Sequence, residues 1–166
     1  MITDLQAWSA ELVLNSSFIP DFGSLNLLRQ AETRFDRYVE LLEMVEGNEP
    51  PEILHTMANS IRMEDDCGAY QVTIDTFCKF MGNEYLNAFI EVLAKVDFRR
   101  SDLASDMVIK MSQIEIGEST TFLQALENEI SNCKSSAAGH CIQIINKEKF
   151  KNTLNHAKPQ LKLVVG

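Results

Sequence analysis

The sequence predicts an all-α protein in which antiparallel helical hairpins pack as a bundle or as a short HEAT-like stack. Two observations lead to this prediction. Apolar residues recur at the i, i+3, i+4 and i+7 spacing of amphipathic helices along most of the 166 residues. Short polar stretches, several with Gly or Pro, separate these segments. No residue pattern recurs at a fixed period, so the stack is inferred from the order of the helices and not from a repeat.

The first two helices are expected over residues 4–14 and over a longer segment that ends at Gly47. Thr3 and Gln6 have the spacing of a capping box at the start of the first helix. Residues 15–23 are predicted to be a loop because they contain both Pro and Gly. Gly47 suits a left-handed C-cap for the second helix. The expected inward faces consist of Leu5, Trp8, Leu12, Leu25, Leu28, Phe35, Tyr38, Leu42 and Val45.

Five further helices are predicted between residues 50 and 132. Pro50 and the proline after it can begin the first of them. The second and third, around residues 70–81 and 83–93, are expected to pack against each other as an antiparallel hairpin. Ser119 can cap the fifth. The side chains expected to be buried together are Phe77, Phe89, Leu93, Met107 and Phe122.

The C-terminal segment permits two interpretations. Residues 133–139 are small and predict a loop. The β-branched residues Ile142, Ile144 and Ile145 would fit a short strand, but the apolar spacing also fits a helix, which we favour. The choice for residues 140–166 stays open at this point. The apolar face of the helix would consist of Ile142, Ile145, Phe150 and Leu154, with Pro159 beyond its end.

Charge divides the chain into two parts, within what we expect to be one domain over residues 1–166. Residues 1–132 hold 9 Lys/Arg and 23 Asp/Glu, whereas residues 133–166 hold six lysines and one acid, Glu148. An acidic body repels nucleic acid and anionic membranes and favours a basic protein partner. The basic segment is expected to fold against this body. We therefore expect neither nucleic-acid binding nor membrane binding.

The sequence lacks the motifs of metal sites and of common catalytic centres. Its histidines and cysteines show no His-x3-His, His-Glu-x-x-His or Cys-x-x-Cys spacing. The cysteines are too few and too scattered for a disulfide framework, and no signal peptide or membrane span is recognised. We therefore expect a cytoplasmic protein with free thiols, without metal or cofactor. The residues concerned are His55, His140, His156, Cys67, Cys78, Cys133 and Cys141.

Two pairs of carboxylates raise the alternative of a hydrolase. Asp65 lies beside Asp66, and Asp102 shares a helix face with Asp106. Acid–base chemistry would require burial that separates the pKa values within a pair. A simpler explanation is that Asp65 or Asp66 caps the helix that follows and that Asp102 serves the N-terminal turn of its own helix.

An acidic stripe is the most unusual feature of the second helix. Glu32, Asp36, Glu40 and Glu43 are spaced 4, 4 and 3 apart, which places four carboxylates on one side. Like charges at this spacing repel one another, so a cationic partner would relieve the repulsion. A merely solvated face is the alternative, because neighbouring arginines can neutralise part of the charge. The residues predicted to contact a partner are Glu32, Asp36, Glu40, Glu43, Glu64, Asp65 and Asp66.

Four stretches, over residues 35–43, 75–80, 84–90 and 91–93, alternate aromatic, leucine and acidic positions. In this pattern the chain resembles the small acidic, helical immunity proteins of bacterial polymorphic-toxin and contact-dependent growth inhibition systems. The resemblance implies a cytoplasmic protein that binds the catalytic domain of a cognate toxin and blocks it without catalysis of its own. Many such toxins are nucleases with basic clefts. An all-α adaptor without inhibitory activity is the alternative.

Overall fold

The computed structural model describes residues 2–17, 25–63 and 69–157. Within these ranges the chain is helical, and the predicted all-α class is confirmed; the one β contact there is an isolated bridge between Glu115 and Thr121. None of the described helices is long and apolar enough to cross a bilayer. The α-helices are α1 (Leu5–Asn15), α2 (Leu25–Glu43), α3 (Glu52–Ser60), α4 (Ala69–Phe77), α5 (Leu86–Arg99), α6 (Ser101–Met111), α7 (Phe122–Asn132) and α8 (Ser136–Ala157).

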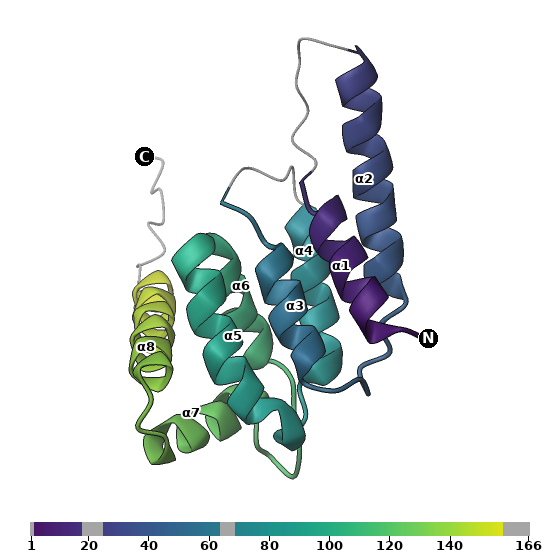
Figure 1. Cartoon of the computed structure of the whole chain (residues 1–166). Coiled ribbons are helices and arrows are strands. Elements are labelled where there is room, and N and C mark those ends of the chain that lie inside the picture. Colours follow the sequence, from purple (N-terminus) through teal and green to yellow (C-terminus); the bar gives the residue numbers. More distant parts are fainter. Residues whose placement is uncertain (1, 18–24, 64–68, 158–166) are drawn as a thin grey trace, which may run out of the picture.

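The helices form two layers that run side by side (Figure 1). In one layer α1 packs against α3, which packs against α5; in the other α2 packs against α4, which packs against α6. The layers contact each other through α1 with α2 and through α5 with α6. α7 and α8 close the end of the stack by packing on α5 and on each other. This arrangement leaves α2 at the edge opposite α8.

The hairpin partner of α5 differs from the prediction. α5 packs against α6, from which only Arg100 separates it, and against α3 in its own layer; it does not form a close hairpin with α4. Two short 3-10 helices, Cys78–Phe80 and Asn83–Tyr85, connect α4 to α5. This connection is long enough for the chain to cross from one layer to the other, which separates two helices that are consecutive in the sequence.

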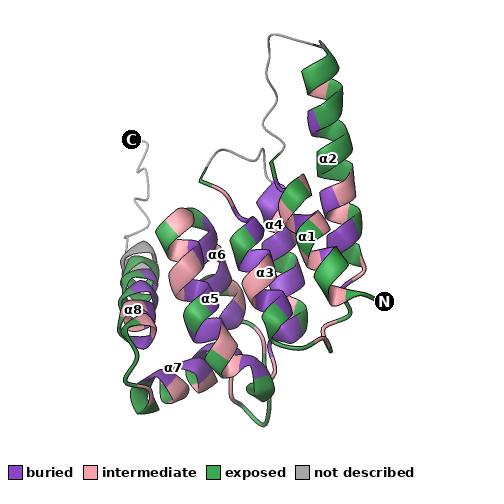
Figure 2. Ribbon diagram, in the orientation of Figure 1, coloured by how far each residue is buried: buried purple, intermediate pink, exposed green. Residues whose placement is uncertain are grey.

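One continuous apolar core runs through the stack, from Trp8 in α1 to Ile145 in α8 (Figure 2). The five residues predicted to be buried together all belong to it, so that prediction is confirmed. The ring of Phe89 contacts the rings of Phe77 and Phe122 edge to face, with centroids 6.1 and 4.9 Å apart. Such pairs stabilise beyond the area they bury. Phe89 therefore links α4, α5 and α7.

Two predicted helix starts were wrong by one or two residues. The N-cap of α1 is Asp4, whose carboxylate accepts a 2.9 Å hydrogen bond from the backbone N–H of Ala7, and not Thr3. α7 is capped by Thr121, which forms a capping box with Gln124, and not by Ser119. Each cap is set by which side-chain oxygen reaches a free backbone N–H three residues later. Gly47 has the predicted left-handed conformation, with a φ of 94°, but α2 ends at Glu43, so Gly47 lies in the turn beyond the helix and is not its C-cap.

The C-terminal segment is helical over Ser136–Ala157, which confirms the favoured helix for residues 140–157. The predicted loop over residues 133–139 was too long, because α8 already begins at Ser136. Cys141, Ile144, Ile145 and Glu148 face the core. Phe150, predicted to face inward, is 65% exposed, because it lies two residues beyond Glu148 and thus on the opposite side of the helix. Residues 158–166, with Pro159, lie outside the described residues.

Candidate binding surface

The apolar side of α2 is covered in its C-terminal half, whereas its acidic side is exposed. Leu27 and Phe35 of the N-terminal half are 40% and 36% exposed, so Phe35 does not face inward as predicted. Tyr38, Leu41 and Leu42 are buried against α1 and α4, which hold α2 at the edge of the stack. The phenol of Tyr38 bonds the hydroxyl groups of Ser60 and Thr73 at 2.8 and 2.5 Å, so the register of α2 against α3 and α4 is also fixed by polar contacts. These contacts fix the position of α2 against α1, α3 and α4.

The structure places the predicted stripe on this outer face. The side chains of Glu32, Asp36, Glu40 and Glu43 are all exposed, as the periodicity predicted. The three other predicted contact residues, Glu64, Asp65 and Asp66, lie outside the described residues. From here on, the acidic stripe means Glu32, Asp36, Glu40 and Glu43.

Arg37 neutralises one member of the acidic stripe. Its Nε and Nη2 atoms donate hydrogen bonds of 2.7 and 3.0 Å to the carboxylate of Glu11 in α1, and its Nη1 donates one of 2.9 Å to Glu40. These hydrogen bonds raise the pKa of Arg37 and lower the pKa of Glu11. Glu32, Asp36 and Glu43 form no ion pair with any residue that the structure describes. Three of the four carboxylates of the acidic stripe therefore have no ion-pair partner among the described residues.

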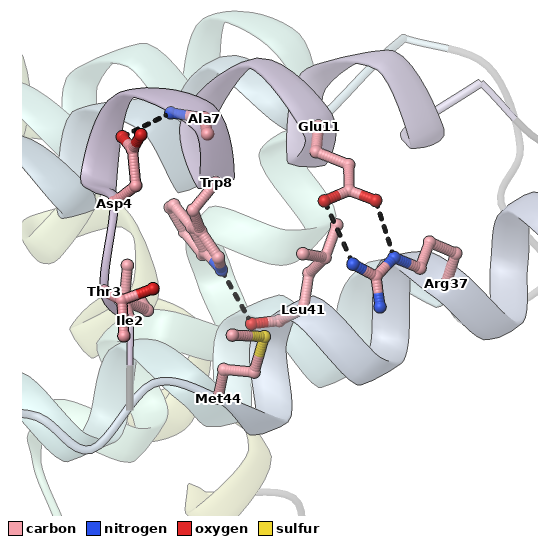
Figure 3. Close-up of a pocket in the computed structure, with 9 residues that line it drawn as sticks. All are labelled: Ile2, Thr3, Asp4, Ala7, Trp8, Glu11, Arg37, Leu41 and Met44. Carbon is pink, nitrogen blue, oxygen red and sulfur yellow. Dashed lines mark hydrogen bonds and ion pairs between the residues drawn. The ribbon is translucent and has the colours of Figure 1, made fainter.

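A small hollow of about 160 Å³ lies between α1 and α2, beside the pair of Glu11 and Arg37 (Figure 3). The indole N–H of Trp8 donates a 2.9 Å hydrogen bond to the carbonyl of Leu41, and the ring is 3% exposed. Of the charged groups that line the hollow, Glu11 and Arg37 are paired with each other, and Asp4 caps α1. We interpret it as the seam that holds α1 on α2. Its walls are Ile2, Thr3, Asp4, Ala7, Trp8, Glu11, Arg37, Leu41 and Met44.

Not every acid after the stripe belongs to the surface. The carboxylate of Glu49 accepts 2.8 Å hydrogen bonds from the backbone N–H groups of Glu46 and Gly47. Burial alone would raise the pKa of Glu49, but these backbone hydrogen bonds hold it below its usual value. Glu49 therefore shapes the turn after α2.

Of the two carboxylate pairs considered for a hydrolase, Asp65 and Asp66 lie outside the described residues, and in the other pair Asp102 is engaged by a neighbouring arginine. Asp102 is exposed and pairs with the guanidinium of Arg100 through contacts of 3.0 and 2.7 Å, which lower its pKa. Asp102 lies in the first turn of α6, which agrees with the interpretation that it serves the N-terminal turn of that helix. Among the described residues, no group of three His, Cys, Asp or Glu side chains could hold a metal ion.

Cys133, His140 and Cys141 are close in the sequence, but the structure gives each of them a different environment. Cys141 is buried and donates to the carbonyl of Ile90, and burial raises the pKa of its thiol to about 12. The Nε2 atom of His140 lies 3.0 Å from Asp97. Cys133 lies before α8, where a hydrogen bond with Ser135 lowers its pKa. The three groups thus have separate surroundings.

The described part of the basic segment packs on the acidic body. α8 contacts α5, α6 and α7, and Lys149 forms a 2.5 Å ion pair with Glu127 of α7. This agrees with the expectation that the segment folds against the body.

Sequence reasoning missed a second surface feature, at the ends of α3 and α5. Phe98 and Met63 are exposed there beside Arg62 and Arg99. The sequence did carry a signal for this surface. Phe98 is a large apolar residue that falls outside the inward-facing positions Phe89, Leu93 and Val96 of its helix.

Comparison with protein-family models, with curated proteins and with solved structures found no match. The class of the protein is therefore described by its own structure, which is a two-layer all-α stack with an acidic helix at its edge.

Proposed function

We propose that the chain is an immunity protein, which binds the catalytic domain of a cognate toxin of the nuclease class through the acidic stripe and blocks it. The observation that carries the proposal is the set of three exposed carboxylates, Glu32, Asp36 and Glu43, without an ion-pair partner among the described residues. The protein would act by binding and would perform no catalysis.

The geometry of the stripe suits a cleft that normally holds a phosphate backbone. Residues four apart on a helix rise about 6 Å along its axis, so the stripe from Glu32 to Glu43 is a row of anions about 17 Å long. Such a row can occupy cationic positions that would otherwise bind successive phosphates. Because α2 is packed on α1 and α4, the helix backbone that carries the carboxylates is held in place before binding, which reduces the ordering cost.

Electrostatics supports both affinity and speed. Like charges at helical spacing repel one another, and a basic partner relieves that repulsion. The net charge of −9 also steers a cationic partner toward the protein, which accelerates association at low salt. Rapid capture is useful for a protein that must intercept a toxin.

A growth-rescue experiment tests the proposal. The chain is co-expressed with the protein encoded immediately upstream of its gene. The variants are Asp36→Lys/Glu43→Lys on the stripe and, as a control of equal charge change, Glu115→Lys/Glu118→Lys on the exposed connection between α6 and α7. The parent and the control are expected to rescue growth, and the stripe variant is expected to lose rescue while it stays folded by circular dichroism.

Affinity measurements with purified proteins test the proposal quantitatively. We expect the stripe variant to bind the toxin domain at least about tenfold more weakly than the control, with a shallower dependence of affinity on salt. Glu40→Gln should weaken binding less than Asp36→Asn, because Arg37 already balances Glu40. A folded stripe variant that binds like the parent would place the contact elsewhere.

The alternative is an all-α adaptor that gathers proteins without inhibiting them. Stacked helix pairs provide extended binding surfaces, so the fold suits this role too. Binding of the upstream product without growth rescue would favour the adaptor. Failure of both binding and rescue would contradict the immunity proposal.

A further inference from the structure

A second surface of opposite charge lies at the C-terminal ends of α1, α3 and α5, which point to the same end of the stack (Figure 1). Arg62 donates from Nε to the hydroxyl group of Ser16 at 3.1 Å and from Nη2 to the carbonyl of Val13 at 3.2 Å. Arg99 donates from Nη1 to the carbonyls of Asn59 and Ile61 at 2.9 and 2.6 Å. These bonds hold both guanidinium groups in place.

The acceptors are neutral, so both positive charges remain available. Neither Arg62 nor Arg99 forms an ion pair within the part of the chain that the structure describes. These hydrogen bonds use Nε and Nη2 of Arg62 and only Nη1 of Arg99, so within the described residues both guanidinium groups keep N–H donors for a further acceptor. A carboxylate is the acceptor that a guanidinium binds most strongly in proteins.

Lys95 extends the positive charge along α5. It lies one turn before Arg99 and is half-buried. Burial and the charge of Arg99 together lower the pKa of Lys95, against the opposing effect of Glu91. Lys95, Arg99 and Arg62 thus form a basic island on a protein whose net charge is −9.

Apolar side chains accompany the basic island. Phe98 is 81% exposed and Met63 is 71% exposed, and with Arg62 and Arg99 they line an open hollow of about 360 Å³. Aromatic residues, Met and Arg are the residue types enriched at protein interfaces, and truncation of a central aromatic residue typically costs much of the affinity. A hollow lined by two guanidinium groups and two exposed apolar side chains suits one kind of occupant.

We propose that this hollow binds an extended acidic segment of a partner protein, in which a carboxylate lies beside an apolar side chain. The carboxylate pairs with Arg62 or Arg99, and the apolar side chain covers Phe98 and Met63. A nucleic acid fits less well, because three cations on a protein of charge −9 provide little attraction for a long polyanion. The inference goes beyond the proposed function because it concerns another surface and a partner of opposite charge.

Selection from a random peptide library displayed on phage, with the full-length chain as bait at low salt, tests the proposal. The enriched peptides are expected to contain Asp or Glu next to Leu, Phe or Trp. A fluorescent synthetic copy of the most enriched peptide is then titrated by anisotropy. Phe98→Ala should weaken its binding by about tenfold or more. The matched control is Phe150→Ala, which removes an aromatic residue that is also exposed, on α8.

The charge requirement is tested on the peptide, because replacement of Arg62 or Arg99 would also remove hydrogen bonds that end α1 and α3. Exchange of the acidic residues of the peptide for Asn and Gln should weaken binding by about tenfold or more. Selection of basic peptides, equal binding to Phe98→Ala, or no enrichment would overturn the proposal. Displacement of the peptide by a single-stranded oligonucleotide, or self-association of the chain that Phe98→Ala abolishes, would also overturn it. The stripe variants leave this surface intact, so failure here is distinguishable from failure of the immunity proposal.

Discussion

The carboxylate of Glu148 accepts a 2.7 Å hydrogen bond from the hydroxyl group of Ser105, which joins α8 to α6. Glu148 is the one acidic residue after position 132 and is 4% exposed. Lys151, one turn further along α8, donates a 2.5 Å hydrogen bond to the same carboxylate. The basic segment therefore uses its single acid to dock on the acidic body.

Replacement of Glu148 by Gln is expected to lower the free energy of unfolding at pH 7 by about 1 to 3 kcal/mol, because Lys151 loses its charged partner. Burial alone would raise the pKa of Glu148, but the hydrogen bonds from Lys151 and Ser105 hold it below its usual value. A lowered pKa stabilises the fold above the unfolded pKa, about 4.3, and this contribution is lost as the pH falls through the folded value.

Urea denaturation of the parent and Glu148→Gln at pH 7 and near pH 3 measures this effect. The stability difference should shrink at the lower pH, where the carboxyl group is protonated in the parent too. The exposed Glu118→Gln is the control and should show no difference at either pH. An equally large difference at both pH values would contradict the linkage.

Truncation of Phe89 to Ala is expected to cost about 3 to 5 kcal/mol of unfolding free energy, through lost transfer energy and an internal cavity. Phe89 is fully buried and contacts Phe77 and Phe122. Phe98→Ala removes the same side chain from an exposed position on the same helix and should change stability by less than about 0.5 kcal/mol. A loss below about 1 kcal/mol for Phe89→Ala would contradict the packing of α4, α5 and α7.

Two glycines should respond to Ala in opposite directions. Gly47 has a φ of 94°, and an added Cβ would lie 2.5 Å from the backbone oxygen of Lys79, so Gly47→Ala should destabilise by about 2 kcal/mol or more. Gly139 lies within α8 with open space around an added Cβ, so Gly139→Ala should stabilise by about 0.4 to 1 kcal/mol. Thermal melts of both variants beside the parent measure the difference. Equal effects would show that the turn at Gly47 tolerates a side chain.

Cys133 is expected to react with iodoacetamide faster than Cys78 or Cys141 near pH 7.5. The hydrogen bond with Ser135 lowers the pKa of Cys133, whereas burial raises the pKa of the other two thiols. Because the thiolate is the nucleophile, the rate at Cys133 should rise with pH around a midpoint below 9.0. Ser135→Ala should move this midpoint upward.

Mass spectrometry that resolves each cysteine reads the four positions separately. Ser135 also accepts a 3.0 Å hydrogen bond from the backbone N–H of Ala138, so the stability of Ser135→Ala is measured in parallel. Modification of Cys141 as fast as Cys133 in the folded protein would contradict the prediction.

The exposed face of α2 was predicted correctly because it depends only on the spacing of residues along the helix. The N-cap of α7 was not, because it depends on which side-chain oxygen lies within hydrogen-bond distance of a free backbone N–H. The stripe from Glu32 to Glu43 was predicted to share one face, and all four of its side chains are exposed. The cap of α7 was misplaced because Ser119 and Thr121 are both good N-cap residues. The structure decides between them, since Thr121 pairs with Gln124 and Ser119 adopts a φ of 65°.

The surfaces were predictable only in part. That carboxylates line α2 could be seen from their spacing, but the partner of Arg37 could not, because Glu11 is 26 residues away on another helix. The basic island was not predicted because its members come from the ends of α3 and α5, separated by the whole of α4.

The sequence by itself determined the helical class and the face on which each residue of a helix lies, because both depend on side chains within a few turns of one another. Only the tertiary structure decided that α5 packs on α3 and α6 and that Arg62 reaches Val13, 49 residues earlier. Such contacts follow from which apolar faces bury the most surface together, and the periodicity of a single helix carries no information about its partner.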